Sequence, residues 1–228
     1  NSTIDQQIDI LQSAFRNSSI AFRPVGRTFT INEEWTGSID GTKWERDMKT
    51  ALRKGDYRTV NLFIQKNLGR DGRCPNPESR ASDPDRFILD GCVIAPETLP
   101  GGPEPDTGEG KTAVHEIGHW FGLYHTFEDW RNNINGSPNG CYGEGDRVED
   151  TPPQRGTTSG IMCGWPNVQN YRDSCPQKCK AVGDCVPNPE GDPLNNYMGY
   201  CPDRNLTEFT AGQATRMFRI YDTYRKNA

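Results

Sequence analysis

The sequence predicts a single domain of mixed α/β class, in which a twisted mixed sheet carries helices in an upper lobe and the lower lobe is irregular. Helix-type and strand-type hydrophobic patterns alternate in the first half of the 228 residues, which is typical of helices packed on such a sheet. Periodicity then disappears over residues 128–206, which are dense in Gly, Pro, Asn, Asp and Cys. We expect an upper lobe over residues 1–125 and a lower lobe over residues 126–228, closed by a C-terminal helix.

Amphipathic helices flank the predicted sheet. The first spans residues 3–15 behind a polar opening, and the second ends at Gly55. Thr210 caps the closing helix, which runs to about Arg225. Apolar residues recur at helical spacing in each of them: Ile4, Ile8, Leu11 and Phe15, then Trp44, Met48 and Leu52, and finally Ala214, Met217, Phe218 and Tyr221.

Strands are predicted from β-prone runs at residues 27–32, 59–65 and 87–95. The last of these runs into the turn-rich residues 96–110. We expect the run at 87–95 to form an exposed edge of the sheet, to which an extended peptide could add through main-chain hydrogen bonds.

Composition indicates an extracellular protein. Eight cysteines, an even number, suit four disulfides in an oxidising compartment, and the paired Cys-x-x-Cys spacing of zinc knuckles is absent. The net charge of −5 and the pI near 5.3 argue against a nucleic-acid partner. No run approaches the roughly 18 apolar residues of a membrane helix, and no charged-then-apolar leader opens the chain. We therefore expect a processed, secreted, monomeric protein with no membrane partner.

Glycosylation sequons agree with that location. Each could accept a glycan in a eukaryotic host, although Pro138 weakens the third of them. They read Asn1-Ser-Thr, Asn17-Ser-Ser, Asn135-Gly-Ser and Asn205-Leu-Thr.

The three histidines of the chain all lie in residues 115–125, which read HEIGHWFGLYH. On a helix, His115 and His119 project from one face about one turn apart, so both imidazoles can bind one metal ion. Gly122 can adopt the positive φ that ends a helix and returns His125 toward the same ion. Three protein ligands leave the fourth position of a tetrahedral zinc open for water, as in catalytic sites.

Glu116, beside the first of these histidines, is the candidate general base of a zinc hydrolase. Two alternatives stay open. A bare HExxH occurs by chance in helices whose histidines only cap, pair or pack, and a downstream glutamate such as Glu144 or Glu149 could replace His125 as the third ligand. The offsets of Gly122 and His125 favour the site of three histidines.

The histidine segment and the later Asn196-Tyr-Met-Gly-Tyr200 together resemble the metzincin metalloproteases, in which a tight turn with a methionine follows the zinc helix. Within the metzincins, the chain is similar to the pappalysin family, especially its secreted microbial and fungal members. The resemblance covers residues 58–222 and is most specific at residues 111–127. Further segments that carry it are His125-Thr-Phe127, Asp146-Arg-Val-Glu-Asp-Thr-Pro152 and Glu208-Phe-Thr-Ala-Gly-Gln213.

The resemblance implies a zinc endopeptidase of metzincin fold, with an extended substrate lying between an α/β upper lobe and an irregular lower lobe. It makes Met198 an apolar floor under the zinc, although a methionine there could be a plain core residue. Tyr200 matches the tyrosine that stabilises the oxyanion, although an aromatic ring could simply pack there. Asp203, five residues after Met198, matches an aspartate at the floor of the pocket for the residue after the scissile bond. That match implies a preference for Arg or Lys, and the alternative is a solvated loop aspartate.

The resemblance also implies a calcium site and a set of disulfides. Asp146, Thr151 and a backbone carbonyl near Val148 match a segment that binds calcium in the family. Cys201 directly follows Tyr200, which departs from the family pattern, and the Cys179–Cys185 stretch looks inserted. Family pairing suggests Cys141–Cys175 and Cys163–Cys201, which leaves Cys74–Cys92 and Cys179–Cys185.

These residues predict peptide hydrolysis without a covalent acyl-enzyme. With zinc as the Lewis acid, Glu116 accepts a proton from the attacking water and passes it to the leaving amine, while Tyr200 stabilises the oxyanion. A binding module that keeps zinc only for structure would need neither residue. A hydrolase of non-peptide amides would not need a long cleft beside an edge strand.

Overall fold

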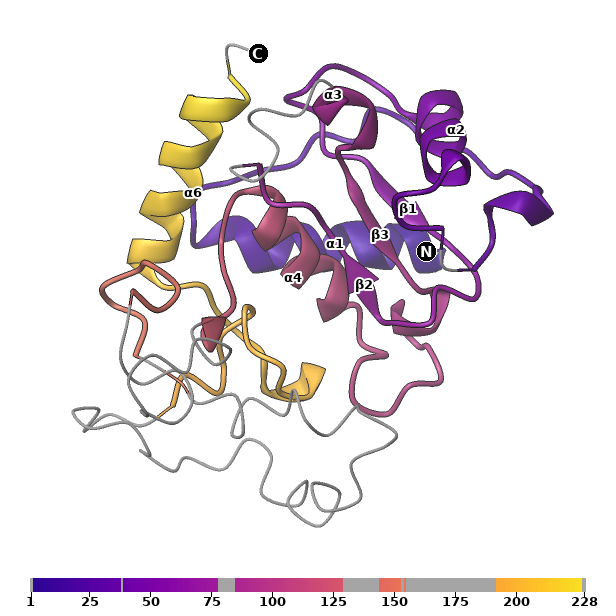
Figure 1. The fold of residues 1–228 in the computed structure, drawn as a ribbon. Helices are drawn as coiled ribbons and strands as arrows, with labels where there is room; N and C mark the ends of the chain where they lie inside the picture. Colours follow the sequence, from indigo (N-terminus) through magenta and orange to yellow (C-terminus); the bar gives the residue numbers. More distant parts are fainter. Residues whose placement is uncertain are drawn as a thin grey trace, which may run out of the picture.

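The computed structural model describes residues 2–37, 39–77, 85–128, 144–152, 154 and 192–226. In this part of the chain, helices surround a small sheet, and the helix α6 stands beside them (Figure 1). The helices are α1 (Thr3–Arg16), α2 (Lys43–Leu52), α3 (Arg86–Leu89), α4 (Lys111–Trp120) and α6 (Ala211–Tyr224), with short 3₁₀ helices η1 (Glu33–Trp35), η3 (Pro96–Thr98) and η7 (Asp203–Asn205). The strands are β1 (Leu62–Ile64), β2 (Gly72–Arg73) and β3 (Cys92–Ile94).

The sheet is mixed, as predicted, with the strand order β1-β3-β2. Strand β3 runs parallel to β1 and antiparallel to β2. All three residues of β3 are buried, so the expectation that residues 87–95 form an exposed edge is wrong. The first residues of that run instead form α3, and β2 is the edge strand on the side of β3 away from β1.

Helices α2 and α4 cover opposite faces of the sheet. Because successive side chains of a strand point to opposite faces, Cys92 and Ile94 share one face while Val93 faces the other. Cys92 and Ile94 join the apolar residues of α4 in one core cluster. Val93 packs with Phe63 of β1 and Met48 of α2 in a second cluster. This layering places α4 directly against the centre of the sheet.

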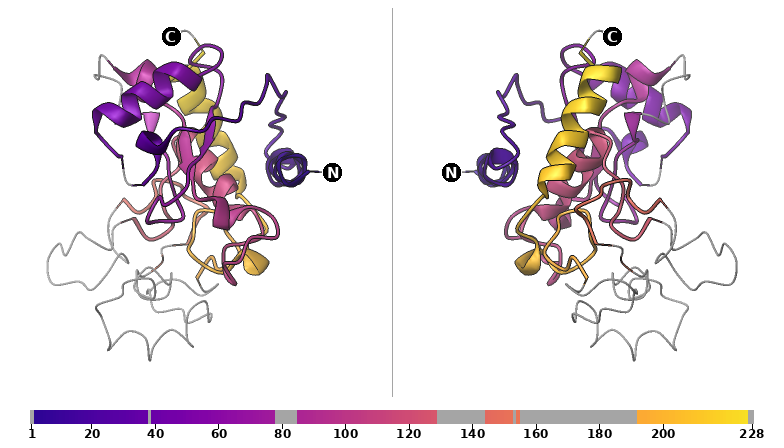
Figure 2. Two further views of the ribbon diagram at one scale, coloured as in Figure 1. Left: turned by 90° about the vertical axis from the view of Figure 1, so that its right-hand side faces the viewer. Right: turned by 90° about the vertical axis from the view of Figure 1, so that its left-hand side faces the viewer.

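Helix α1 packs on the outer side of α4 and appears end-on in Figure 2, near the N-terminus. It spans the predicted residues, and Ser2 forms a capping box with Asp5 at its start. Phe15 is fully buried in the same core cluster as α4. The Gln7 side-chain amide donates a hydrogen bond to the Gly110 carbonyl, 2.9 Å away, at the residue before α4. Helix α1 therefore contacts the residue that precedes α4.

The strand predicted at residues 27–32 is not formed. These residues carry no regular secondary structure, and the side chains of Phe29 and Ile31 are 85% and 100% exposed. Alternating β-prone residues form a strand only when a neighbouring strand takes up their backbone hydrogen bonds, and no described strand lies beside them. The predicted run at 59–65 shortens to β1 for the same reason.

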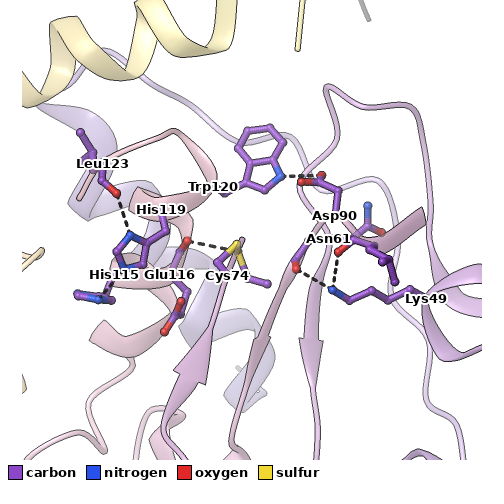
Figure 3. Close-up of a disulfide and its surroundings, with 12 residues drawn as sticks. Lys49, Asn61, Cys74, Asp90, His115, Glu116, His119, Trp120 and Leu123 are labelled. Carbon is purple, nitrogen blue, oxygen red and sulfur yellow. Dashed lines mark hydrogen bonds between the residues drawn. A yellow bond between two sulfur atoms is a disulfide. The ribbon is translucent and has the colours of Figure 1, made fainter. Parts of the chain in front are cut away.

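The C-terminal helix is locked to the end of α4. Its N-terminus has the predicted cap, a capping box between Thr210 and Gln213. At its other end, the fully buried Arg225 pairs with the buried Asp90, 2.9 Å away, and donates to the Trp120 carbonyl at 3.1 Å. Asp90 also accepts from the Trp120 indole at 3.0 Å, as Figure 3 shows. Among the described residues, no helix is long and apolar enough to span a bilayer.

Candidate active site

Helix α4 presents the histidine motif and ends where the sequence predicts. Gly122 has the expected positive φ of 89°, and its amide donates to the His119 carbonyl at 2.8 Å. A β-carbon on Gly122 would also lie 2.5 Å from Ile220 of α6, so a side chain is excluded on both grounds. This turn sends the chain back across the helix toward His125.

The three histidine rings converge on one point. The Nε2 atom of His119 lies 3.1 Å from Nε2 of His115 and 3.1 Å from Nε2 of His125. In the part of the chain that the structure describes, this is the only group of potential metal ligands that lies close together. Glu144, the alternative third ligand, instead pairs with Arg147 at 2.9 Å, and neither it nor the exposed Glu149 joins the group.

The other nitrogen of each ring is held by an acceptor. His115 Nδ1 lies 2.7 Å from the Tyr197 carbonyl oxygen. His119 Nδ1 lies 2.8 Å from the Leu123 carbonyl oxygen, as Figure 3 shows. His125 Nδ1 lies 3.1 Å from a carboxylate oxygen of Glu128. Because carbonyl and carboxylate oxygens only accept, each Nδ1 carries the proton and each Nε2 points a lone pair inward.

This donor set fits a zinc ion. Three facing lone pairs repel one another unless a cation binds them, and a tetrahedral zinc with Zn–N bonds of about 2.0–2.1 Å would place its nitrogens roughly 3.3 Å apart. Burial lowers the pKa of His119 to about 3 and that of His115 well below its usual range, and repulsion between the histidines adds to both shifts. The rings of His115 and His119 are therefore neutral at physiological pH, as metal binding requires.

Glu116 is buried beside the histidines, with 6% of its surface exposed. Burial raises the pKa of its carboxyl group to about 8, against the opposing effect of Arg73. Its side chain lies against β2 of the sheet. A carboxyl group in this environment has a raised proton affinity, which suits proton transfer near neutral pH.

Two residues of the turn at 196–200 complete the site. Met198 is fully buried, and its sulfur packs so closely on α4 that a β-carbon on Gly118 would lie 2.5 Å from Sδ. Asn196 Oδ1 holds the turn by accepting from the Met198 amide at 2.9 Å. The hydroxyl of Tyr200 lies 3.1 Å from Nε2 of His125. The Tyr200 hydroxyl thus lies at the histidines, and Met198 packs against the helix that carries two of them.

Asp146, Val148 and Thr151 lie close together in the described segment at residues 144–152. Asp146 Oδ1 accepts from the Val148 amide at 3.1 Å, and the Thr151 amide donates to the Val148 carbonyl at 3.3 Å. The other carboxylate oxygen of Asp146 is buried and has no hydrogen-bond partner among the described residues. Burial raises the pKa of this carboxyl group to about 7.

Asp203 is a buried residue, so the alternative of a solvated loop aspartate is wrong. It is 3% exposed, and Oδ2 accepts from the backbone amides of Glu109 at 2.9 Å and Lys111 at 3.1 Å. Lys111 is the first residue of α4, so the carboxylate caps the histidine helix from a distant part of the chain. Burial raises the pKa of Asp203 to about 6 despite these hydrogen bonds.

A disulfide joins Cys74 to Cys92, as predicted. Cys201 is also disulfide-bonded, but its predicted partner Cys163 lies outside the described residues, as do the predicted pairs Cys141–Cys175 and Cys179–Cys185. Among the glycosylation candidates, Asn17 and Asn205 are exposed. Asn1 and Asn135 lie outside the described residues.

Sequence reasoning missed one residue that contacts the histidines. Glu128 also accepts from the His125 backbone amide at 3.2 Å, so its carboxylate contacts both the backbone and the imidazole ring of His125. A carboxylate three residues after a candidate ligand is a usable signal, because ligating histidines commonly donate their second N–H to such a group.

The chain matches one peptidase family along most of its length. A sequence profile of the peptidase M43 family, described as pregnancy-associated plasma protein-A, matches residues 46–222. An extracellular metalloprotease of Podospora anserina is 41% identical over 226 residues, which cover 99% of this chain and 67% of that protein. An extracellular metalloprotease of Neurospora crassa is 42% identical and is covered to 68% of its length.

Solved structures agree with this match. Mature mirolysin of Tannerella forsythia, in complex with a cleaved peptide, superposes with a TM-score of 0.66 at 25% identity. The match covers 97% of this chain and 84% of mirolysin. The fold, the histidine cluster and the sequence therefore lead to the same family.

Proposed function

This chain belongs to the pappalysin family of metalloproteases, and from that premise we propose that it is a secreted, zinc-dependent endopeptidase in which Glu116 is the general base. One observation carries the proposal: three Nε2 atoms converge at zinc-binding distances beside a buried glutamate and the Tyr200 hydroxyl. A protein that held zinc only for structure would need neither of these two residues.

The chain's own residues account for the proton transfers. When bound, zinc supplies Lewis acidity, which makes water nucleophilic at neutral pH and polarises the scissile carbonyl. Glu116 accepts the proton of the attacking water and delivers it to the leaving amine. Its buried position beside the histidines places the carboxyl group where it can carry the proton from the first step to the second.

Tyr200 and Met198 have supporting roles in this proposal. The Tyr200 hydroxyl donates a hydrogen bond to the oxyanion of the tetrahedral intermediate, a role supported by its place 3.1 Å from His125 Nε2. Met198 forms an apolar floor beneath the histidines, and its full burial excludes water there.

An extended protein or peptide substrate would add along β2, the edge strand beside α4. For the residue after the scissile bond, Asp203 would favour Arg or Lys through a charge-assisted hydrogen bond. Because Oδ2 of Asp203 already accepts from two backbone amides, we assign binding of the cationic side chain to Oδ1. Sequencing the products of a peptide library tests this preference, which an unchanged profile in Asp203→Asn would contradict.

A structural calcium site at Asp146, Val148 and Thr151 is part of the same proposal. The buried, unpartnered oxygen of Asp146 supports it, because a hard cation satisfies such an oxygen. Calcium should then raise the melting temperature more at pH 8 than at pH 5.5, since protonation of Asp146 competes with the cation near its pKa of about 7. An equal effect at both values would contradict the site.

The proposal places the enzyme outside the cell as a monomeric catalytic domain, with glycans at the exposed Asn17 and Asn205. The extracellular names of the fungal relatives support this location. The chain spans about two thirds of their length, at 67% and 68%.

Casein hydrolysis in the presence and absence of a chelator tests the proposed function. We expect cleavage that o-phenanthroline abolishes and that zinc restores. Zinc binding without casein cleavage would indicate a binding module, and cleavage of small amides alone would indicate a different hydrolase.

A further inference from the structure

The Glu116 side chain packs directly against the edge strand β2. A β-carbon built on Gly72 would lie 2.6 Å from Glu116 Oε1, 2.8 Å from Cγ and 3.0 Å from Cδ. These distances are too short for a real side chain, so only glycine lets the carboxyl group occupy this position. Gly72 does not have a positive φ, which means that its backbone conformation would accept another residue. The contact with Glu116 is therefore what constrains position 72.

The Cys74–Cys92 disulfide lies beside Glu116 of α4. It joins Cys74, the residue after β2 (Figure 3), to Cys92, the first residue of β3. Cys92 is fully buried in the core cluster that contains the apolar residues of α4. Cys92 Sγ lies 3.3 Å from the backbone carbonyl oxygen of Glu116. The disulfide thus lies against the backbone of Glu116, while Gly72, two residues before Cys74, lies against its carboxyl group.

Strand β2 is short and depends on anchors outside itself. It pairs with β3 through only two residues, Gly72 with Ile94 and Arg73 with Val93, and it has no strand on its other side in the described structure. Such a short edge strand frays easily. The side chain of Arg73 ties it toward α2 through Glu45, which leaves the disulfide as the covalent anchor on the side of Glu116.

We propose that Gly72 and the Cys74–Cys92 disulfide are positioning elements for Glu116, which hold β2 against the catalytic carboxyl group and so fix its direction toward the bound water. This inference rests on the proposed function, because it assigns Glu116 the part of the base. Opening the bridge releases the end of β2 from β3, so Gly72 no longer confines the carboxyl group to its productive orientation. Proton transfer then slows, while the three histidines, which are held by other groups, keep the metal.

The Gly72→Ala variant tests the positioning of Glu116 without destabilising β2. The atoms that the new β-carbon meets belong to the end of a flexible side chain, so Glu116 turns away and the backbone stays in place. We expect kcat to fall roughly 10- to 100-fold, with KM and zinc content unchanged, because small misplacements of catalytic groups cost about that much. Gly26→Ala is the matched control, since its β-carbon would meet only Lys54 at ordinary distances of 3.5 and 3.6 Å.

Cys74→Ala/Cys92→Ala is the second variant. We expect a similar loss of kcat with one zinc per chain, together with faster hydrogen exchange in the β2–β3 pairing of Gly72 with Ile94 and Arg73 with Val93. If this variant does not fold, Gly72→Ala decides, because it keeps the bridge. Wild-type kcat in a folded Gly72→Ala protein would overturn the proposal, as would parallel loss of zinc and activity in both variants. Failure of the proposed function would appear separately, as wild-type protein that hydrolyses no casein or is insensitive to chelator.

Discussion

His115 and His119 lie on helix α4 and are held by backbone carbonyl oxygens, whereas His125 lies beyond the helix and is held by the side chain of Glu128. The two halves also differ in exposure. His115 and Glu116 are 7% and 6% exposed, while Tyr200, which contacts His125, is 38% exposed. We call His115, Glu116 and His119 the helix half of the site. We call His125, Glu128 and Tyr200 the rim half.

The difference teaches that the two halves respond to different changes. In the helix half, backbone atoms orient the ligands, so only substitution of the ligands themselves or of their packing can move them. In the rim half, side chains orient each other on irregular backbone. Metal affinity and turnover should therefore be adjustable through the rim without loss of the fold.

The largest effect should follow removal of the rim ligand. His125→Ala leaves two histidines, and the loss of one ligand from a site worth on the order of 10 kcal/mol should weaken zinc binding roughly a thousandfold. Competition with a fluorescent chelator measures the affinity. One tightly bound zinc per chain with normal turnover would show that His125 is not a ligand.

In the rim half, Tyr200→Phe should lower the rate of catalysis without affecting zinc binding. Loss of one donor to an oxyanion costs about 10²-fold in kcat, whereas the ring itself is kept. Zinc content and KM should stay at their wild-type values. Steady-state kinetics with a quenched fluorescent peptide would reveal the split, and an unchanged kcat would leave Tyr200 as a packing residue.

Glu128→Ala should have a smaller effect, on metal affinity. Removal of such a carboxylate partner typically weakens metal binding by about 10-fold or more. Glu128→Gln should lose less, because its amide oxygen can still accept from His125. No equivalent substitution exists in the helix half, where the acceptors are backbone carbonyls. Equal zinc affinity in wild type and Glu128→Ala would remove the proposed distinction between the halves.

The smallest effect concerns Asp203, which caps the start of α4. The pKa of Asp203 is raised from 3.8 to about 6 by burial, so the folded protein binds this proton more tightly than the unfolded chain. Its contribution to stability is fully present below about pH 4 and is lost as the pH rises through 6. Asp203→Asn removes this dependence. Its free energy of unfolding relative to wild type should therefore rise by about 1–3 kcal/mol as the pH increases from 4 to 7. Urea unfolding at several pH values tests this, and a constant difference would contradict it.

The helix half was predictable from sequence because its geometry is local. The spacing of His115 and His119 and the positive φ of Gly122 follow from helix geometry alone. The rim and the sheet depend on partners far away in the chain. The Asp-Gly-Arg sequence around β2 reads as a turn, and only pairing with β3 makes it a strand.

Long-range contacts also explain the errors. Residues 87–95 were expected at an edge, but the burial of β3 between β1 and β2 is a property of the whole sheet. Asp203 meets the amide of Lys111, 92 residues earlier, and no spacing rule connects the two positions. The same limit hid the contact between Gly72 and Glu116.

Glu116→Gln gives the most direct test of the central claim, that the helix half binds zinc and also supplies the base. The amide has nearly the same shape as the carboxyl group, so packing against β2 should persist, but it cannot accept the proton. We expect one zinc per chain by metal analysis and a loss of casein hydrolysis by several orders of magnitude. A zinc-loaded Glu116→Gln protein that cleaves casein at a rate comparable to wild type would contradict the account.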